Sequence, residues 1–188
     1  MSAKKLVVGL GGMPGAGKSL VVETARELGY SIVTMGDIIR EETQKRGLEQ
    51  NPQNVGKVML ELRSKGGNYV VAQKCIPKIE QEINDRVLVD GLRSLHEAEI
   101  FQEHFSTFTL LAVHASPQVR FNRLTLRSRS DDPPNWEVFH ERDMRELGVG
   151  LGNVIAMAEK ILVNDDSVER FKVQVRENFV RVEDKWLK

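Results

Sequence analysis

The chain has 188 residues, of which 40% are hydrophobic and 29% charged, values typical of a globular protein with one substantial core. Lys and Arg together number 27, as do Asp and Glu, so the net charge is zero and no overall positive field favours nucleic-acid binding. The single cysteine, Cys75, excludes an internal disulfide, and its apolar helical surroundings indicate a core residue. No apolar run approaches the ~18 residues of a membrane span, and a strand from about residue 5 leaves no room for a signal peptide. We therefore expect a cytoplasmic protein with no membrane partner.

The first predicted elements are a buried strand over 5–10 and a helix over 20–28, with a glycine-rich segment between them. That segment, Gly-Met-Pro-Gly-Ala-Gly-Lys-Ser over 12–19, fits G-x-x-x-x-G-K-[ST], the phosphate-binding P-loop. Its backbone N–H groups should converge on a phosphate at the helix N-terminus. Lys18 should reach the β- and γ-phosphates, and the Ser19 hydroxyl should bind Mg²⁺. The residues expected to bind the nucleotide are Gly12, Pro14, Gly15, Ala16, Gly17, Lys18, Ser19 and Leu20.

The rest of the chain alternates short apolar strands with helical patterns. In chain order, the further predictions are a strand over 31–35, a helix capped by Asp37 over 37–46, helices over 55–66 and 69–85, a strand over 86–90, a helix over 94–101, a strand over 108–113, helices over 117–127, 135–147 and 155–159, a strand over 160–164 and a helix over 167–182. This alternation predicts an α/β fold, with a five-stranded parallel sheet covered on both faces, in a single domain over 1–188. Ligands of such sheets bind beyond the carboxyl ends of the strands, where Lys18, Asp37, Asp90 and Arg93 are expected to lie.

Three of the charged residues near these strand ends are candidates for phosphate or metal binding. Asp90 stands where a carboxylate would complete the Mg²⁺ sphere with Ser19; the alternative is an exposed acid that caps the next turn. Arg93 and Arg40 suit the bidentate recognition of a second phosphate. Arg40 is also compatible with a solvated helix residue paired with a neighbouring glutamate.

A cluster of six arginines without a lysine lies between residues 120 and 145, at Arg120, Arg123, Arg127, Arg129, Arg142 and Arg145. Helical spacing predicts that Arg120, Arg123 and Arg127 share one face. Two arginine-bearing helices around a polar loop suggest a lid, at about 127–147, that closes over polyphosphate. The alternative is an ordinary charged face balanced by neighbouring acids.

Taken in order, these motifs resemble the nucleoside monophosphate kinase group of P-loop proteins, especially adenylate kinase, over roughly residues 5–180. The segment 11–19 is similar to the family's glycine-rich loop, and 34–40 to its threonine, glycine, aspartate, arginine segment. The segment 90–93, Asp-Gly-Leu-Arg, resembles its Asp-Gly-Phe-Pro-Arg. The segment 129–132, Arg-Ser-Asp-Asp, resembles the Arg-x-Asp-Asp of its short lid, with Arg142 or Arg145 as the later lid arginine.

The resemblance implies a three-layer α/β/α P-loop kinase fold with a short lid, and ATP and Mg²⁺ as cofactors. It implies that helices within about 36–85 bind the acceptor, through residues at Thr34, Asp37, Arg40, Arg93 and Glu97. The catalytic residues would be Lys18, Arg93, Arg129 and Arg142, with Arg123 also on the donor nucleotide. Ser19 and Asp90 would hold the metal ion.

Two departures from the adenylate kinase pattern bear on the acceptor. The Asp-Gly-Leu-Arg segment is one residue shorter and lacks the proline. Glu97 stands where that family has a glutamine that reads adenine, and an ionised carboxylate only accepts hydrogen bonds, which argues against AMP. The segment 158–165 is similar to the final strand of dephospho-CoA kinases. The chain thus resembles an archaeal-type family of adenylate kinase-related proteins.

The expected function is ATP- and Mg²⁺-dependent phosphoryl transfer to a small nucleotide-type acceptor. One alternative is transfer to a hydroxyl, as on dephospho-CoA, for which Asp37 would be the base rather than a helix cap. An alternative of another class is a nucleotide-dependent switch or assembly ATPase. The choice between ATP and GTP, the acceptor and the oligomeric state stay open, and nucleic acid is not an expected partner.

Overall fold

The fold is built on a sheet of five parallel strands, seen in a computed structural model that describes residues 5–127, 129 and 132–186. Its strands are β1 (Leu6–Gly12), β2 (Ser31–Thr34), β3 (Arg86–Leu92), β4 (Phe108–His114) and β5 (Lys160–Val163). Their order in the sheet is β2-β3-β1-β4-β5, so β1 lies at the centre, paired in parallel with β3 and β4. The predicted five-stranded parallel sheet is confirmed.

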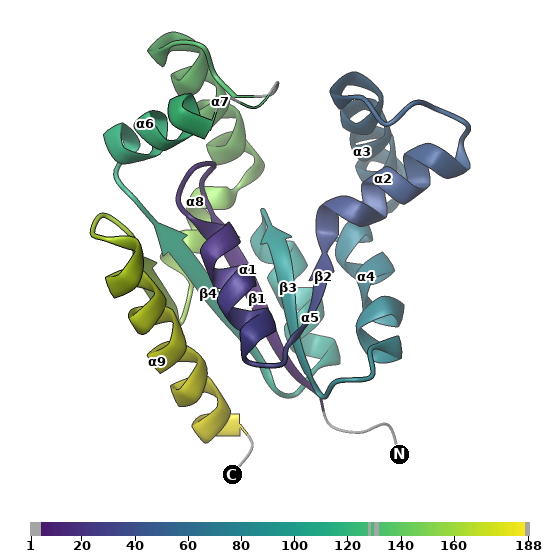
Figure 1. Ribbon diagram of the computed structural model, residues 1–188. Helices are drawn as coiled ribbons and strands as arrows, with labels where there is room; N and C mark the ends of the chain where they lie inside the picture. Colours follow the sequence, from purple (N-terminus) through teal and green to yellow (C-terminus); the bar gives the residue numbers. More distant parts are fainter. Residues whose placement is uncertain (1–4, 128, 130–131, 187–188) are drawn as a thin grey trace.

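The helices cover both faces of the sheet and extend beyond one of its edges (Figure 1). In the described residues they are α1 (Lys18–Glu27), α2 (Met35–Lys45), α3 (Pro52–Gly66), α4 (Val70–Gln81), α5 (Leu95–His104), α6 (Pro117–Arg127), α7 (Trp136–Val149), α8 (Leu151–Ala156) and α9 (Val168–Trp186). Helices α1 and α9 cover one face, whereas α4, α5 and α8 cover the other. None of the helices in this described part has the length and apolar character needed to cross a bilayer.

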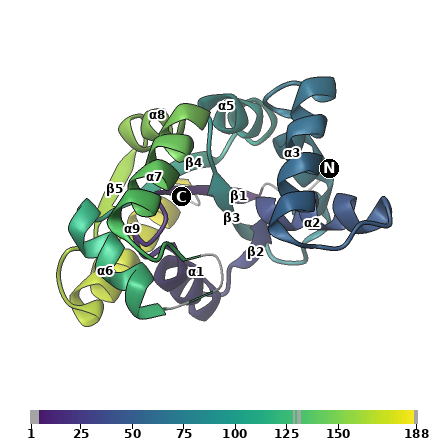
Figure 2. The same ribbon diagram turned by 90° about the horizontal axis from the view of Figure 1, so that it is seen from above.

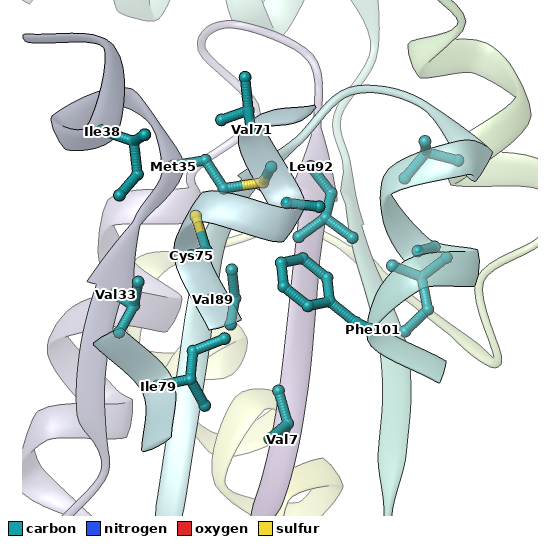
Figure 3. Close-up of a cluster of buried hydrophobic side chains, with 14 of the residues drawn as sticks. Val7, Val33, Met35, Ile38, Val71, Cys75, Ile79, Val89, Leu92 and Phe101 are labelled. Carbon is teal, nitrogen blue, oxygen red and sulfur yellow. The ribbon is translucent and has the colours of Figure 1, made fainter. Parts of the chain in front are cut away.

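Successive side chains of a strand point to opposite faces of the sheet, so the apolar strands form two apolar layers, one on each face. Leu6 and Val8 of β1 pack into the layer under α1 and α9, while Val7 packs into the opposite layer. Figure 3 shows this second layer, where Val7 and Val89 of the sheet gather with Cys75 of α4. Burial raises the pKa of Cys75 to about 12, as expected for a core thiol. Both faces are therefore closed, and the edge at the carboxyl ends of the strands is left for a site.

At that edge, α2 and α3 stand above β2 and β3, and α6 and α7 stand on the other side of the P-loop (Figures 1 and 2). The two groups of helices come from segments far apart in the sequence. The arrangement places the P-loop between them.

The structure corrects the predicted helix start at Asp37. Strand β2 ends at Thr34 and passes directly into α2, whose N-cap residue is Thr34 itself. Asp37 therefore lies in the first helical turn and does not cap the helix. Its carboxylate accepts hydrogen bonds from Arg40 one turn later, which is the pairing expected at this helical spacing.

Several further boundaries differ from the predictions by a few residues, among them those of α8 and the end of α4. Helix α8 spans Leu151–Ala156 instead of 155–159, because Gly150 adopts a left-handed φ of 111° that both ends α7 and begins α8. Helix α4 ends at Gln81, four residues before the predicted end at 85. The stretch 148–152, between the helices predicted over 135–147 and 155–159, is mostly helical in the structure.

Candidate active site

The P-loop joins β1 to α1 and has the backbone conformation that its glycines permit. Gly15 and Gly17 have φ values of 79° and 108°, in the left-handed region that favours glycine. A Cβ atom on Gly17 would lie 2.1 Å from Nδ2 of Asn164, so a side chain here would displace a buried neighbour. Lys18 Nζ donates a hydrogen bond to the carbonyl of Gly12, at 2.6 Å. The Lys18 side chain, at the N-terminus of α1, therefore folds back over the first residue of the P-loop.

One cavity, the P-loop cavity, lies between the P-loop, α6 and α7 and has a volume of about 670 Å³. Its lining is strongly cationic. The charged residues that line it are Lys18, Arg26, Arg93, Arg123, Arg127, Arg129 and Arg142, against Asp90 and Glu146. Such an excess of positive charge next to a P-loop suits a polyphosphate.

A second cavity, the α2–α4 cavity, is bounded by α2, α3, α4 and the end of β3 and has a volume of about 400 Å³. Its apolar lining comes from Met35, Ile39, Val55, Met59 and Val71. Its polar lining comes from Lys18, Thr34, Arg40, Arg63, Asp90, Arg93 and Glu97. A small molecule with a flat apolar part and an anionic part matches this composition.

The two cavities meet at four residues, Lys18, Thr34, Asp90 and Arg93, which line both. Burial lowers the pKa of the Lys18 ammonium, and the negative charge of Asp90 opposes that effect. Burial likewise raises the pKa of the Asp90 carboxyl, opposed by the charges of Lys18 and Arg93. A molecule in each cavity would therefore have its reacting end beside the same charged groups.

Asp90 and Ser19 are suitable ligands for a magnesium ion. Both line the P-loop cavity, and carboxylate and hydroxyl oxygens are the hard donors that Mg²⁺ prefers. Oδ1 of Asp90 is buried and has no hydrogen-bond partner among the described residues. Such an oxygen fits a cation that brings its own water shell. The alternative of an exposed acid at the strand end does not match this burial.

Arg40 and Asp37 lie together on α2 and share an ion pair. Arg40 donates to Oδ1 of Asp37 through Nε at 3.0 Å and Nη2 at 2.6 Å. Arg40 lines the α2–α4 cavity, whereas Asp37 belongs to the described lining of neither cavity. The structure therefore places the arginine in the predicted position and its carboxylate partner outside it.

Glu97 lines the α2–α4 cavity, but its carboxylate is largely occupied by protein donors. It forms a capping box with Ser94 at the start of α5, and its side chain is almost fully buried. Arg63 Nη2 donates to Oε1 at 3.1 Å, and the backbone N of Arg93 donates to Oε2 at 2.8 Å. Glu97 therefore fixes both an arginine of the cavity and the backbone that carries Arg93.

The arginines of α6 do not share one environment, contrary to the expectation from their spacing. Arg123 and Arg127 line the P-loop cavity, with Arg129 beyond the helix. Arg120 does not line it, since its guanidinium is buried against Asp143 of α7. Asp143 of α7 holds the Arg120 side chain in the interior, and the spacing of the arginines along α6 could not predict a partner on another helix.

Two further features of the arginine-rich segment bear on the predicted lid. Of the two later candidates, Arg142 lines the P-loop cavity, whereas Arg145 is exposed and outside its described lining. Asp132 accepts hydrogen bonds from the Arg127 side chain and from the backbone N of Arg129, and the first of these lowers the pKa of Asp132. Ser130 and Asp131 of the predicted lid motif lie outside the described residues.

Sequence reasoning missed three polar residues of the P-loop cavity, Arg26, Asn164 and Glu146. Asn164 is buried and directly follows β5; its Nδ2 donates to the carbonyl of Ala16 at 2.8 Å. Its Oδ1 accepts from Nη2 of Arg123 at 3.3 Å. The rule that ligands gather beyond strand ends, applied to the fifth strand, would have identified Asn164. Glu146, in the middle of α7, carries no comparable signal.

Comparison with known proteins is consistent with this architecture. The family model described as an AAA domain matches residues 11–140. The UPF0200 protein MJ1399 of Methanocaldococcus jannaschii is 48% identical over 166 residues, which cover 87% of this chain and 84% of the relative. The UPF0200 protein of Hyperthermus butylicus is 45% identical, with 93% of both chains covered.

Solved structures share the fold at low sequence identity. Shikimate kinase from Bacteroides thetaiotaomicron superposes with a TM-score of 0.62 at 19% identity, over 93% of this chain and 98% of that one. TT1252 from Thermus thermophilus gives a TM-score of 0.62 at 17% identity, over 94% and 97%. The predicted three-layer α/β/α P-loop kinase fold is therefore confirmed. The chain belongs to the UPF0200 family, as the identities to its relatives show, and its residues 11–140 match an AAA domain within a kinase-like P-loop fold.

Proposed function

We propose that the chain is an ATP- and Mg²⁺-dependent phosphotransferase that acts on a nucleotide-type acceptor carrying a phosphate. One observation carries the proposal: a cationic cavity at the P-loop and a partly apolar cavity at α2–α4 meet at Lys18, Thr34, Asp90 and Arg93. A switch ATPase needs a nucleotide site only. A second ligand-sized cavity that opens on the same charged groups is what a two-substrate reaction requires.

The roles of the donor side follow from its charges. The P-loop amides and Lys18 hold the triphosphate, and Arg123, Arg129 and Arg142 surround its outer end. When bound, Mg²⁺ would neutralise charge on the phosphates, with Ser19 and Asp90 as its protein ligands. The α6–α7 pair, which carries Arg123 and Arg142, would act as a lid that excludes water from the transferring group.

The roles of the acceptor side favour a phosphate over a hydroxyl. Arg40 and Arg93 line the α2–α4 cavity and would hold an acceptor phosphate in line with the donor. A phosphate is already anionic and needs no general base, whereas a hydroxyl does. The predicted base, Asp37, is paired with Arg40 and is outside the described lining of this cavity. Transfer to an acceptor phosphate, assisted by charge neutralisation, is therefore the simpler mechanism.

The test is the rate of ATP consumption with Mg²⁺, measured alone and with each of a panel of nucleoside monophosphates and dephospho-CoA. We expect at least one monophosphate to raise the rate and to be recovered as its diphosphate. Lys18→Ala should lower the rate on the order of 100-fold or more, because it removes a charge that acts on the transferring group. Lys172→Ala, on α9 and outside the described cavity linings, is the matched control and should leave the rate unchanged.

Other outcomes would contradict the proposal in distinct ways. Slow ATP hydrolysis that is indifferent to every acceptor would indicate a switch ATPase. Acceleration by dephospho-CoA alone would indicate the hydroxyl route. Failure to bind any nucleoside triphosphate with Mg²⁺ would contradict both routes of phosphoryl transfer and the switch ATPase as well.

A further inference from the structure

The part of the α2–α4 cavity formed by α3 and α5 contains a polar pair, Arg63 and Glu97, among apolar side chains. Nη2 of Arg63 donates to Oε1 of Glu97 at 3.1 Å. The other carboxylate oxygen, Oε2, accepts from the backbone N of Arg93 at 2.8 Å and of Ser94 at 3.3 Å. Glu97 is only 1% exposed, so its carboxylate is engaged by the protein and offers a substrate little surface.

Arg63 is the member of the pair that remains able to bind a ligand. An arginine has five N–H donors and no acceptor, and Glu97 uses Nη2. Nε of Arg63 is buried and has no hydrogen-bond partner among the described residues. Leaving a buried donor unsatisfied is costly, so the site is complete only when something accepts from it. The neighbouring lining of Ile39, Val55 and Met59 is apolar.

The charge of the Arg63–Glu97 pair limits which chemical group of a ligand can accept a hydrogen bond from Nε of Arg63. Arg63 and Glu97 together are neutral. An anionic group of the ligand placed beside them would gain little from the arginine and would be repelled by the carboxylate. An amino group of the ligand would place its N–H donors against the N–H donors of Arg63, with no acceptor between them. A carbonyl oxygen on a flat ring satisfies the donor and matches the apolar lining.

On the basis of the proposed function, we propose that Arg63 is a specificity-determining residue that donates to a keto oxygen on the acceptor's base. The acceptor is accordingly a nucleoside monophosphate whose base carries a keto group where adenine or cytosine carries an amino group. Glu97 acts as a positioning residue that holds the Arg63 guanidinium and, through the Arg93 backbone, links the base end of the cavity to its phosphate end.

The experiment compares nucleotides matched except for this group: inosine with adenosine monophosphate, and uridine with cytidine monophosphate. Their dissociation constants are measured by calorimetry without ATP, and kcat/KM for phosphoryl transfer is measured with it. We expect the keto member of at least one pair to be preferred on the order of tenfold or more, since a site built around a hydrogen bond rejects analogues that lack it. Equal binding within both pairs, a preference for the amino members or no binding of any monophosphate would overturn the inference.

Variants of Arg63 assign the preference to this residue. Arg63→Met should bring the keto-to-amino ratio close to one while ATP binding is retained, because Arg63 lies outside the described lining of the P-loop cavity. Arg63→Lys keeps the positive charge beside Glu97 but loses the fork, and should lower the ratio severalfold even where the Met variant fails to fold. Lys65→Met, on the same helix and exposed, is the control and should keep the wild-type ratio. Full keto preference in Arg63→Lys and Arg63→Met would overturn the inference. A strong amino preference with rapid transfer would do the same and leave the proposed phosphotransferase intact.

Discussion

Arg120 and Asp143 form a buried ion pair that joins α6 to α7. Nη1 of Arg120 donates to Oδ1 of Asp143 at 2.8 Å, and Nη2 donates to Oδ2 at 2.5 Å. Nη1 also lies 3.2 Å from the carbonyl of Pro14 in the P-loop, to which it donates. The ring of Phe139 packs against the same guanidinium, at 5.0 Å. One side chain thus connects the P-loop to α6 and α7, the helices that carry Arg123, Arg127 and Arg142 of the P-loop cavity.

Asp143→Ala should therefore be strongly destabilising. It leaves the buried guanidinium of Arg120 without its counter-ion, a loss typically of about 3–5 kcal/mol. The measurement is the free energy of unfolding from urea denaturation. Asp166→Ala is the control, because its pair with Arg170 is exposed and should contribute at most about 1 kcal/mol. Equal, small losses in both variants would show that the buried pair does not hold α6 against α7.

Asn164→Ala should weaken nucleotide binding as well as stability. The variant leaves the carbonyl of Ala16 without the 2.8 Å hydrogen bond from Nδ2, at a cost of about 1–3 kcal/mol. It also removes the acceptor for Arg123, whose guanidinium lines the P-loop cavity. The KM for ATP should rise several times above the wild-type value.

A matched control for Asn164 exists on α9. Asn178 donates from Nδ2 to the carbonyl of Gln174, also at 2.8 Å, and lies outside the described cavity linings. Asn178→Ala should lower stability without a change in the KM for ATP. An unchanged KM in the Asn164 variant would mean that this residue supports only the fold.

The pH dependence of stability should change in Asp90→Asn. Because burial raises the pKa of Asp90 in the folded protein, the folded state binds the proton more tightly than the unfolded chain, whose carboxyl keeps a pKa near 3.8. Wild-type stability is therefore lost as the pH rises from that value through the raised folded pKa. Asparagine does not titrate, so the variant's advantage in melting temperature should appear across this window and level off above it.

The comparison requires the unligated protein, because bound Mg²⁺ would stabilise the ionised carboxylate and the negative charge of a bound nucleotide would also shift its pKa. The same pair of proteins in a Lys18→Ala background separates the effect of Asp90 from that of the lysine, whose own pKa burial lowers. A melting-temperature difference that stays constant with pH would show that Asp90 keeps its ordinary pKa. If the advantage appears together with a loss of activity, Asp90 is a residue whose burial is retained for function at the expense of stability.

The sequence predicts those parts of the candidate site that lie in one continuous segment or at a strand end. The P-loop is encoded by eight adjacent residues, 12–19, whose glycines and lysine have local reasons to be there. Asp90 and Arg93 were found because the carboxyl ends of parallel strands share one edge of the sheet. The two cavities meet at these residues, as the positions of Lys18, Asp90 and Arg93 in the chain suggested.

What the sequence could not provide was the partner of each charged side chain. Arg63 and Glu97 are 34 positions apart and meet only because α3 and α5 are brought together in the fold. Arg120 has a spacing that favours a shared face with Arg123, yet a carboxylate on α7 withdraws it from that face. The predicted start of α2 was wrong for a related reason. Strand β2 passes into the helix without a loop, so Gly36 lies inside α2 and does not separate the two elements.

Glu146→Gln should tighten the binding of phosphates at the junction of the two cavities. Oε2 of Glu146 lies 3.6 Å from Nε of Arg93 and has no hydrogen-bond partner among the described residues, so it is an ionic neighbour that an incoming phosphate must displace. Burial lowers the pKa of Lys18, and the charge of Glu146 opposes that effect because it stabilises the lysine's cation. Removing that charge makes the junction more attractive to anions, and the effect should fade as salt screens it.

The measurement is the dissociation constant of ATP and of the preferred acceptor at low and at high ionic strength. Several-fold tighter binding at low salt in Glu146→Gln, with no change in Glu141→Gln on the exposed side of the same helix, would identify Glu146 as a competitor for Arg93. Weaker binding would instead mean that Glu146 helps to hold the ligand or its metal ion. Because Arg93 directly follows β3 and Glu146 belongs to α7, the first outcome would also mean that the phosphate breaks this ion pair between the sheet and α7 as it binds. Helix α7 would then close over the ligand only after the ligand has arrived.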